Sequence, residues 1–122
     1  MGVEVSSRIG FAIPVLPVLD IGEAVTFYRE RLGFEVLFEY PAYAGFARDG
    51  VQLHVWCTED PALPRSTSCR FQVSGIDALD AELGARDVIH PNGALAEKPW
   101  GFRELTVLDL CGNCLVFAEP LA

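Results

Sequence analysis

The stretch PWGFRELTVLDLCGNCLVFAE, residues 99–119, predicts a β-hairpin near the end of the chain. Leu105 and Val107 occupy alternate positions before a turn, and Leu115 and Phe117 occupy alternate positions after it. Gly112-Asn113 lies between the two runs, and these are the residue types that most readily adopt a positive φ. A short turn fixes the register of the two strands, so the rest of the chain is interpreted outward from this hairpin.

The first half of the chain predicts a strand, a helix and three further strands. The strand over residues 9–18 contains two prolines, which cannot donate to a sheet and favour an edge position. Asp20 is the predicted N-cap of the helix, with Glu23 completing a capping-box pattern, and the helix runs to about Leu32 before Gly33. The three strands are predicted by alternation and turn residues, over 34–39, 43–48 and 51–57.

The second half repeats this order after a linker over about residues 59–67. A strand at 69–73 leads into a shorter helix that carries Ile76, followed by a strand near Val88, a turn at 91–93 and the hairpin. The last turn glycines, Gly50 and Gly112, are farther apart in the sequence than the helix starts, Ile21 and Ile76, so the second unit has gained residues between helix and turn. The chain therefore predicts a single α+β domain over 1–122. It has two βαβββ modules, about 8–58 and 68–120, which form a cupped mixed sheet completed by dimerisation.

Composition excludes several classes of protein. The 122 residues include 17 acids and nine bases, a formal charge of −8 that repels nucleic acid and anionic membranes. No apolar run approaches the roughly 18 residues of a membrane span, and residues 1–10 lack a signal-peptide pattern, so a cytoplasmic location is expected. Four cysteines without an export signal do not imply disulfides, and for Cys111 and Cys114, which have redox or zinc spacing, a structural role is favoured.

Several short segments resemble one known superfamily. The helix segment from Asp20 through Phe27-Tyr28 to RLGF at 31–34, Trp100-Gly101 before a strand, and the turn DLCGN at 109–113 resemble the vicinal oxygen chelate superfamily. This superfamily contains the glyoxalases, the extradiol dioxygenases and the bleomycin resistance proteins. The last group is the nearest in likeness, because of three segments: IPVL at 13–16, YAG at 43–45 and EKPWG at 97–101.

The resemblance implies a function and also a test of it. Bleomycin resistance proteins are metal-free homodimers that sequester a cationic aromatic glycopeptide in grooves at the dimer interface, without a cofactor. Catalytic members hold a divalent metal instead, at positions that correspond here to Ile13, His54, Ser68 and Val116. Only His54 is a competent ligand, whereas a catalytic site normally has three protein ligands, and of the neighbouring residues only Cys69 can bind metal. A metal-dependent lyase or isomerase acting on a small metabolite, or a binder of an unrelated aromatic metabolite, remains an alternative.

The candidate ligand-binding residues come from strand alternation. If Leu53 and Val55 face the helices, the residues between and beside them face the concave side, and the same alternation applies to the strand at 69–73. With nearby aromatic residues, the predicted set is Phe38, Tyr43, Gln52, His54, Trp56, Arg70, Gln72 and Trp100. The alternative for the polar members is an ordinary solvent-facing sheet. Exposing Trp56 without use would be costly, which favours binding.

Three of these residues carry open questions. His54 can act as a general base, but without a visible partner a hydrogen-bonding or stacking role is favoured. Trp100 is either a wall of the groove or a plug that fixes its loop to the sheet. Arg70 would repel a cationic ligand unless an acid such as Glu39 or Glu97 pairs with it.

Overall fold

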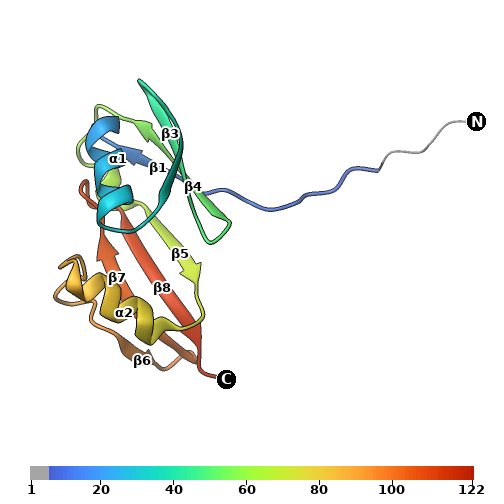
Figure 1. Ribbon diagram of the computed structural model, residues 1–122, viewed down its shortest axis with the longest axis vertical. Coiled ribbons are helices and arrows are strands. Elements are labelled where there is room, and N and C mark those ends of the chain that lie inside the picture. Colours follow the sequence, from blue (N-terminus) through green and yellow to red (C-terminus); the bar gives the residue numbers. More distant parts are fainter. Residues whose placement is uncertain (1–5) are drawn as a thin grey trace, which may run out of the picture.

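The computed structural model describes residues 6–122 and consists of two four-stranded sheets, each covered by one helix (Figure 1). Module one contains, in order, β1 (Val15–Val18), α1 (Ile21–Glu30), β2 (Glu35–Tyr40), β3 (Tyr43–Arg48) and β4 (Val51–Cys57). A short 3₁₀ helix, η1 (Pro64–Ser66), precedes module two. This module contains β5 (Ser68–Gln72), α2 (Ile76–Ala85), β6 (Ala96–Lys98), β7 (Phe102–Leu108) and β8 (Cys114–Pro120).

The two modules have the same topology. Their strand orders are β1-β4-β3-β2 and β5-β8-β7-β6, and in each the first strand pairs in parallel with the last. Val15 is opposite His54 in module one, and Arg70 is opposite Val116 in module two. The number of residues from Val15 to Arg70 equals the number between the two helix starts. Likewise, the number of residues from His54 to Val116 equals the number between the two turn glycines. Both offsets of the predicted repeat are therefore confirmed at the level of strand register.

The helices begin and end largely as their sequences predict. Asp20 accepts a hydrogen bond from the backbone N–H of Glu23 at 2.8 Å, which caps α1. Gly33 has a φ of 72°, and the Phe34 N–H bonds to the Tyr28 carbonyl, which closes the helix. However, α1 ends at Glu30 rather than near Leu32, and α2 is as long as α1, so the prediction of a shorter second helix is wrong.

Three further predictions need correction. The first strand covers only Val15–Val18, because the two prolines leave few donors, and residues 6–14 are outside any strand. Near Val88 there is only an isolated bridge between Ile89 and Val107, and the edge strand of module two is β6 instead. In the hairpin turn Gly112 has a φ of 101°, but Asn113 does not adopt a positive φ; its side chain is buried instead.

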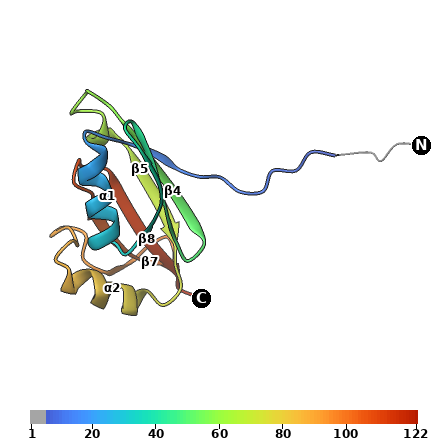
Figure 2. The same cartoon turned by 45° about the horizontal axis from the view of Figure 1, so that its top comes forward.

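Both helices cover the same side of the two sheets, and the other side carries no helix (Figure 2). We call this bare side the open face; it is the predicted concave side. Leu53 and Val55 are fully buried toward the helices, as are Leu105 and Val107, which confirms the alternation that the sequence predicts. No helix within residues 6–122 is long and apolar enough to cross a membrane.

Buried polar contacts join the two modules at the hairpin turn. The Tyr28 hydroxyl donates to Asp109 Oδ2 at 2.7 Å, and the Asn113 side-chain amide donates to the Pro17 carbonyl at 2.7 Å and to Asp109 Oδ2 at 2.8 Å. Burial and the neighbouring Asp109 carboxylate raise the pKa of Tyr28 well above its usual value. The DLCGN turn therefore serves as a joint between the modules.

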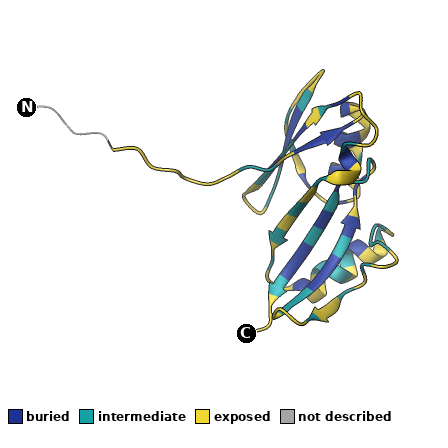
Figure 3. Ribbon diagram, turned by 180° about the vertical axis from the view of Figure 1, so that it is seen from behind, coloured by how far each residue is buried: buried dark blue, intermediate teal, exposed yellow. Residues whose placement is uncertain are grey.

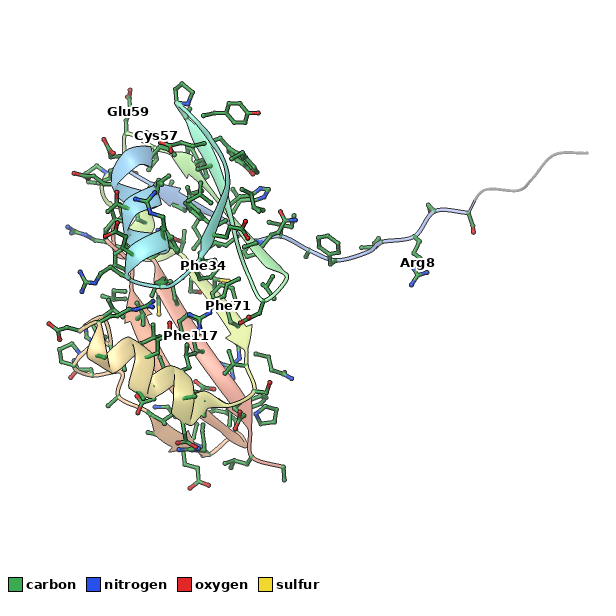
Figure 4. All side chains as sticks on the ribbon, viewed as in Figure 1. Arg8, Phe34, Cys57, Glu59, Phe71 and Phe117 are labelled. Carbon is green, nitrogen blue, oxygen red and sulfur yellow. The ribbon has the colours of Figure 1, made fainter. Side chains whose placement is uncertain are left out.

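A second set of contacts joins the modules farther along the helix side. Arg48 of β3 donates to both carboxylate oxygens of Glu82 on α2, at 2.9 and 2.8 Å. Phe34 of module one and Phe71 and Phe117 of module two point into the same space between the modules (Figure 4). The two modules are thus held in a defined relation, with their open faces on the same side.

Residues 6–14, which precede β1, form an extended arm. It leaves the body on the open side, and its residues 6–12 are exposed (Figure 3). Ile9 and Phe11 are 93% and 75% exposed. Residues 1–5, part of the segment in which the sequence shows no signal-peptide pattern, lie outside the described residues.

Candidate functional site

Module one presents a cluster of aromatic rings on its open face. Two cross-strand rows form it: Phe38, Gly45 and His54 lie opposite one another on β2, β3 and β4, and Tyr40, Tyr43 and Trp56 form the next row. The Phe38 and Tyr43 rings are stacked, with centroids 6.0 Å apart and planes 9° apart. The His54 ring meets Phe38 edge-on at 5.2 Å and Tyr43 at 5.4 Å. We call Phe38, Tyr40, Tyr43 and His54 the aromatic platform.

His54 is held by two hydrogen bonds within this platform. Its Nδ1 lies 2.8 Å from the Tyr43 hydroxyl, and its Nε2 lies 3.1 Å from Gln52 Oε1. Since the Gln52 oxygen only accepts, a neutral imidazole donates from Nε2 and accepts at Nδ1 from Tyr43. Both ring nitrogens are therefore engaged, and the two hydrogen bonds hold the His54 ring in a fixed orientation on the open face.

Module two presents a different cluster on its part of the open face. Glu104 Oε2 accepts a hydrogen bond from Arg70 at 2.5 Å and another from the Trp100 indole N–H at 2.6 Å. The Arg70 guanidinium also lies over the Phe102 ring, 5.0 Å from its centroid. We call Arg70, Trp100, Phe102 and Glu104 the ion-pair cluster.

An acid of the ion-pair cluster balances the charge of Arg70. This partner is Glu104, not Glu39 or Glu97, which sequence reasoning offered as examples. The hydrogen bond from Arg70 lowers the pKa of the Glu104 carboxyl below its usual value, and the bond from Trp100 acts in the same direction. The carboxylate is ionised at neutral pH and balances the guanidinium, so the cluster presents no net charge to a ligand.

Trp100 combines the two roles that its sequence left open. The indole nitrogen fixes the side chain to the sheet through Glu104, yet the residue is 59% exposed. Trp56 is 39% exposed and adjoins the platform through its pairing with Tyr43. Both tryptophans therefore offer ring surface on the open face.

The predicted site residues fall into separate groups. Phe38, Tyr43, Gln52 and His54 contact one another, and Trp56 lies beside them, whereas Arg70 and Trp100 meet only through Glu104. Gln72 joins neither group; it lines a cavity of about 450 Å³ between the modules, together with Phe34, Phe71 and the Arg48–Glu82 pair. Sequence reasoning missed Tyr40, Phe102 and Glu104 as members of these clusters. Tyr40 and Phe102 could have been found from strand alternation, because residues two positions apart in a strand share a face. Tyr40 lies two positions after Phe38, and Phe102 lies two positions after Trp100.

The positions that would hold a superfamily metal do not fit one. His54 and Val116 occupy equivalent places in β4 and β8, and Ser68 begins β5. Among residues 6–122, no three His, Cys, Asp or Glu side chains converge in a way that could hold a metal ion. All four cysteines are free; the Cys111 sulfur accepts from the Leu19 N–H at 3.4 Å, and burial raises the pKa of this thiol.

Comparison with known proteins identifies the family. The family model described as glyoxalase superfamily protein matches residues 3–122, and the chain belongs to this superfamily. Bleomycin resistance proteins of Geobacillus stearothermophilus and Staphylococcus aureus are 28% identical to it, over 90% of this chain and 96% of theirs.

Solved structures agree with this assignment. The bleomycin-binding protein of the bleomycin-producing Streptomyces verticillus, solved with copper(II)-bleomycin, is 34% identical. It is matched over 92% of this chain and 97% of its own, with a TM-score of 0.82. A bleomycin resistance determinant encoded on the transposon Tn5 shares the fold, with 22% identity, coverage of 93% and 100%, and a TM-score of 0.80. The predicted α+β fold of two tandem modules and the predicted likeness to the bleomycin resistance group are confirmed.

Proposed function

We propose that this protein binds bleomycin or a closely similar cationic, aromatic glycopeptide on its open face and sequesters it without breaking a bond. The observation that carries the proposal is the pair of clusters on that face, an aromatic platform and a charge-balanced ion-pair cluster with an exposed tryptophan. Flat heteroaromatic rings stack on such surfaces, and hydrogen-bonding groups beside them fix orientation. The relatives that bind or resist bleomycin support the choice of ligand.

The proposed groove is completed by a second copy of the chain. One copy leaves ring surface of Trp56, Trp100 and Tyr40 in solvent on the open face, which is unusual for a face without a partner. The arm, which carries the exposed apolar residues Ile9 and Phe11, leaves the body on the same side (Figure 2). We propose that two copies join by their open faces and exchange arms, so that the aromatic platform of one faces the ion-pair cluster of the other.

Sequestration is favoured over turnover by the residue types at the superfamily's ligand positions. Ile13, Ser68 and Val116 cannot supply the ligands that a catalytic metal requires, and both His54 nitrogens are already bonded. The rival is a metal-dependent lyase or isomerase of a small metabolite. Elemental analysis of the purified protein separates the two, because the rival requires about one metal ion per chain.

Isothermal titration with bleomycin tests the binding proposal. We expect saturable binding to the wild type, and a loss of about 1–3 kcal/mol of binding free energy in Trp100→Ala and in Trp56→Ala. Trp100→Phe keeps an aromatic ring but removes the N–H that donates to Glu104. Its affinity therefore shows whether Trp100 acts through ring surface that lines the groove or by fixing its loop to the sheet. Leu110→Ala, at an exposed turn residue, is the control for apolar truncation.

Added salt gives a second readout of the same titration. The formal charge of −8 attracts a cationic ligand over a range of about 10 Å at 0.1 M ionic strength, so affinity should fall as salt rises. No heat with the wild type would refute bleomycin as the ligand. Full affinity in both tryptophan-to-alanine variants would refute the groove.

We also propose that the protein works in the cytoplasm as a single domain. Its four cysteines are free thiols, which suits a reducing compartment. The contacts of Tyr28, Asn113 and Arg48 across the module boundary favour cooperative unfolding of residues 1–122 as one unit. Coincident unfolding curves by fluorescence and circular dichroism would support this, and two separate transitions would contradict it.

A further inference from the structure

Gly45 lies at the centre of the aromatic platform, between Phe38 on β2 and His54 on β4. Glycine weakens a strand interior, because it has no side chain to pack and loses more backbone freedom than any other residue on folding. Its backbone here does not require glycine, since Gly45 is not among the residues with positive φ. The reason for this residue must therefore lie in what approaches it.

The Phe38 ring fills the space above Gly45. A Cβ atom at position 45 would lie 2.5 Å from Phe38 Cζ and closer still to Cε2, distances that real carbon atoms do not tolerate. The ring therefore rests directly on the β3 backbone. From this position it stacks on Tyr43 and forms a T-shaped pair with the His54 ring.

A β-bulge explains why Phe38 reaches this face at all. Val36 pairs with Phe46, and Phe38 pairs with the next residue of β3, Gly45, so Leu37 is an extra residue in β2. Without it, Phe38 would lie on the same side as Val36, which packs against the core. Bulges commonly redirect a side chain beside a functional site. Here the bulge turns Phe38 to the open face, and the missing side chain of Gly45 leaves room for its ring there.

We infer that Gly45, together with the Leu37 bulge, is a positioning element that sets the Phe38 ring as the stacking surface for a planar ring of the ligand. This inference rests on the proposed function and names the residue that positions one of its stacking surfaces. Gly45 acts only through Phe38. The competing account is that the aromatic ring covers the glycine solely to stabilise the sheet, an arrangement used for that purpose in β-proteins.

A double-mutant cycle measured by titration with bleomycin separates these accounts. We expect Gly45→Ala and Phe38→Leu each to weaken binding about tenfold, because each removes one well-placed aromatic stack. The combined variant should bind no more weakly than Phe38→Leu alone, because without the ring a methyl group at position 45 displaces nothing. Phe38→Tyr retains the ring and should retain affinity. Gly84→Ala, on an exposed position of α2, controls for the glycine substitution itself.

The outcomes are distinct. If the ring only stabilises the sheet, Gly45→Ala lowers the melting temperature but the folded protein keeps its affinity, and the inference is wrong. Additive losses in the combined variant would also overturn it, because Gly45 would then act without Phe38. Should Gly45→Ala alone fail to fold, full affinity in Phe38→Leu would still overturn the inference, because the ring would then not be a stacking surface for the ligand. No heat with the wild type would refute the proposed function, and with it the ligand that this element serves.

Discussion

Tyr28 is a core residue whose hydroxyl has one task, to donate to the buried carboxylate of Asp109 across the module boundary. We expect Tyr28→Phe to reduce the free energy of unfolding by about 1–3 kcal/mol, because Asp109 Oδ2 then keeps only its bond from Asn113. Chemical denaturation measures this loss. Tyr40→Phe, at a tyrosine that is 62% exposed, is the matched control and should change stability by less than about 0.5 kcal/mol.

Tyr28 also makes the stability of the folded protein depend on pH in the alkaline range. The folded pKa of Tyr28 is raised by burial and by Asp109, so its stabilising contribution is complete below the ordinary tyrosine pKa of about 10. It is lost as the pH rises from there toward the folded pKa, because the unfolded chain ionises first. Tyr28→Phe should flatten the stability curve above that pH. An equally steep fall in the variant would show that another group titrates.

At the scale of strands, the Arg70–Glu104 pair links β5 to β7 across β8 on the open face. The folded pKa of Glu104 is lowered mainly by Arg70, so its contribution is present above the ordinary glutamate pKa of about 4.3 and is lost as the pH falls through the folded pKa. We expect Glu104→Gln to cost about 1–3 kcal/mol at neutral pH and to make the acid limb less steep. Denaturation at several pH values measures both effects.

Glu59→Gln is the control for this prediction, because the Glu59 side chain points away from the body (Figure 4). It removes the same charge from the chain without touching the ion-pair cluster. An acid limb that is equally altered in both variants would assign the effect to net charge and not to the bridge between β5 and β7.

The features that could be predicted from the sequence are those that depend on residues close together in the chain. Strand alternation, the Asp20 cap and the glycine at the end of α1 each depend on residues within a few positions, and the structure contains all of them. Strand β6, with the sequence AEK, has no apolar alternation and exists because β7 offers an edge to pair with. The partner of Arg70 could not be chosen from sequence either, since Glu104 lies on a distant strand of the module and several acids were available. The residue types around Leu37 do not indicate a bulge, yet the bulge decides which face of the sheet Phe38 occupies.

For the molecule as a whole, the central prediction is the exchanged-arm dimer. Sedimentation at micromolar concentration should give a dimer for the wild type, and combined Ile9→Glu and Phe11→Glu should weaken it tenfold or more. Burial of two apolar side chains is worth about 1.5–3 kcal/mol each. Ser7→Glu, on the same exposed arm, is the control. A monomeric wild type would contradict the dimer, and an unchanged dimer in the doubly charged variant would contradict the role of the arm.

The parallel pairing of β1 with β4 has a consequence for how the protein is made. Val15 lies opposite His54, so α1, β2 and β3 must all be synthesised before the first strand meets its neighbour. Ser68 and Cys114 are paired across the whole of module two in the same way. Within each module the strand that leaves the ribosome first is hydrogen-bonded to the one that leaves last, while the strands between them pair in chain order. A growing chain therefore carries β1 with both edges free until β4 has been added, and β5 until β8 has been added.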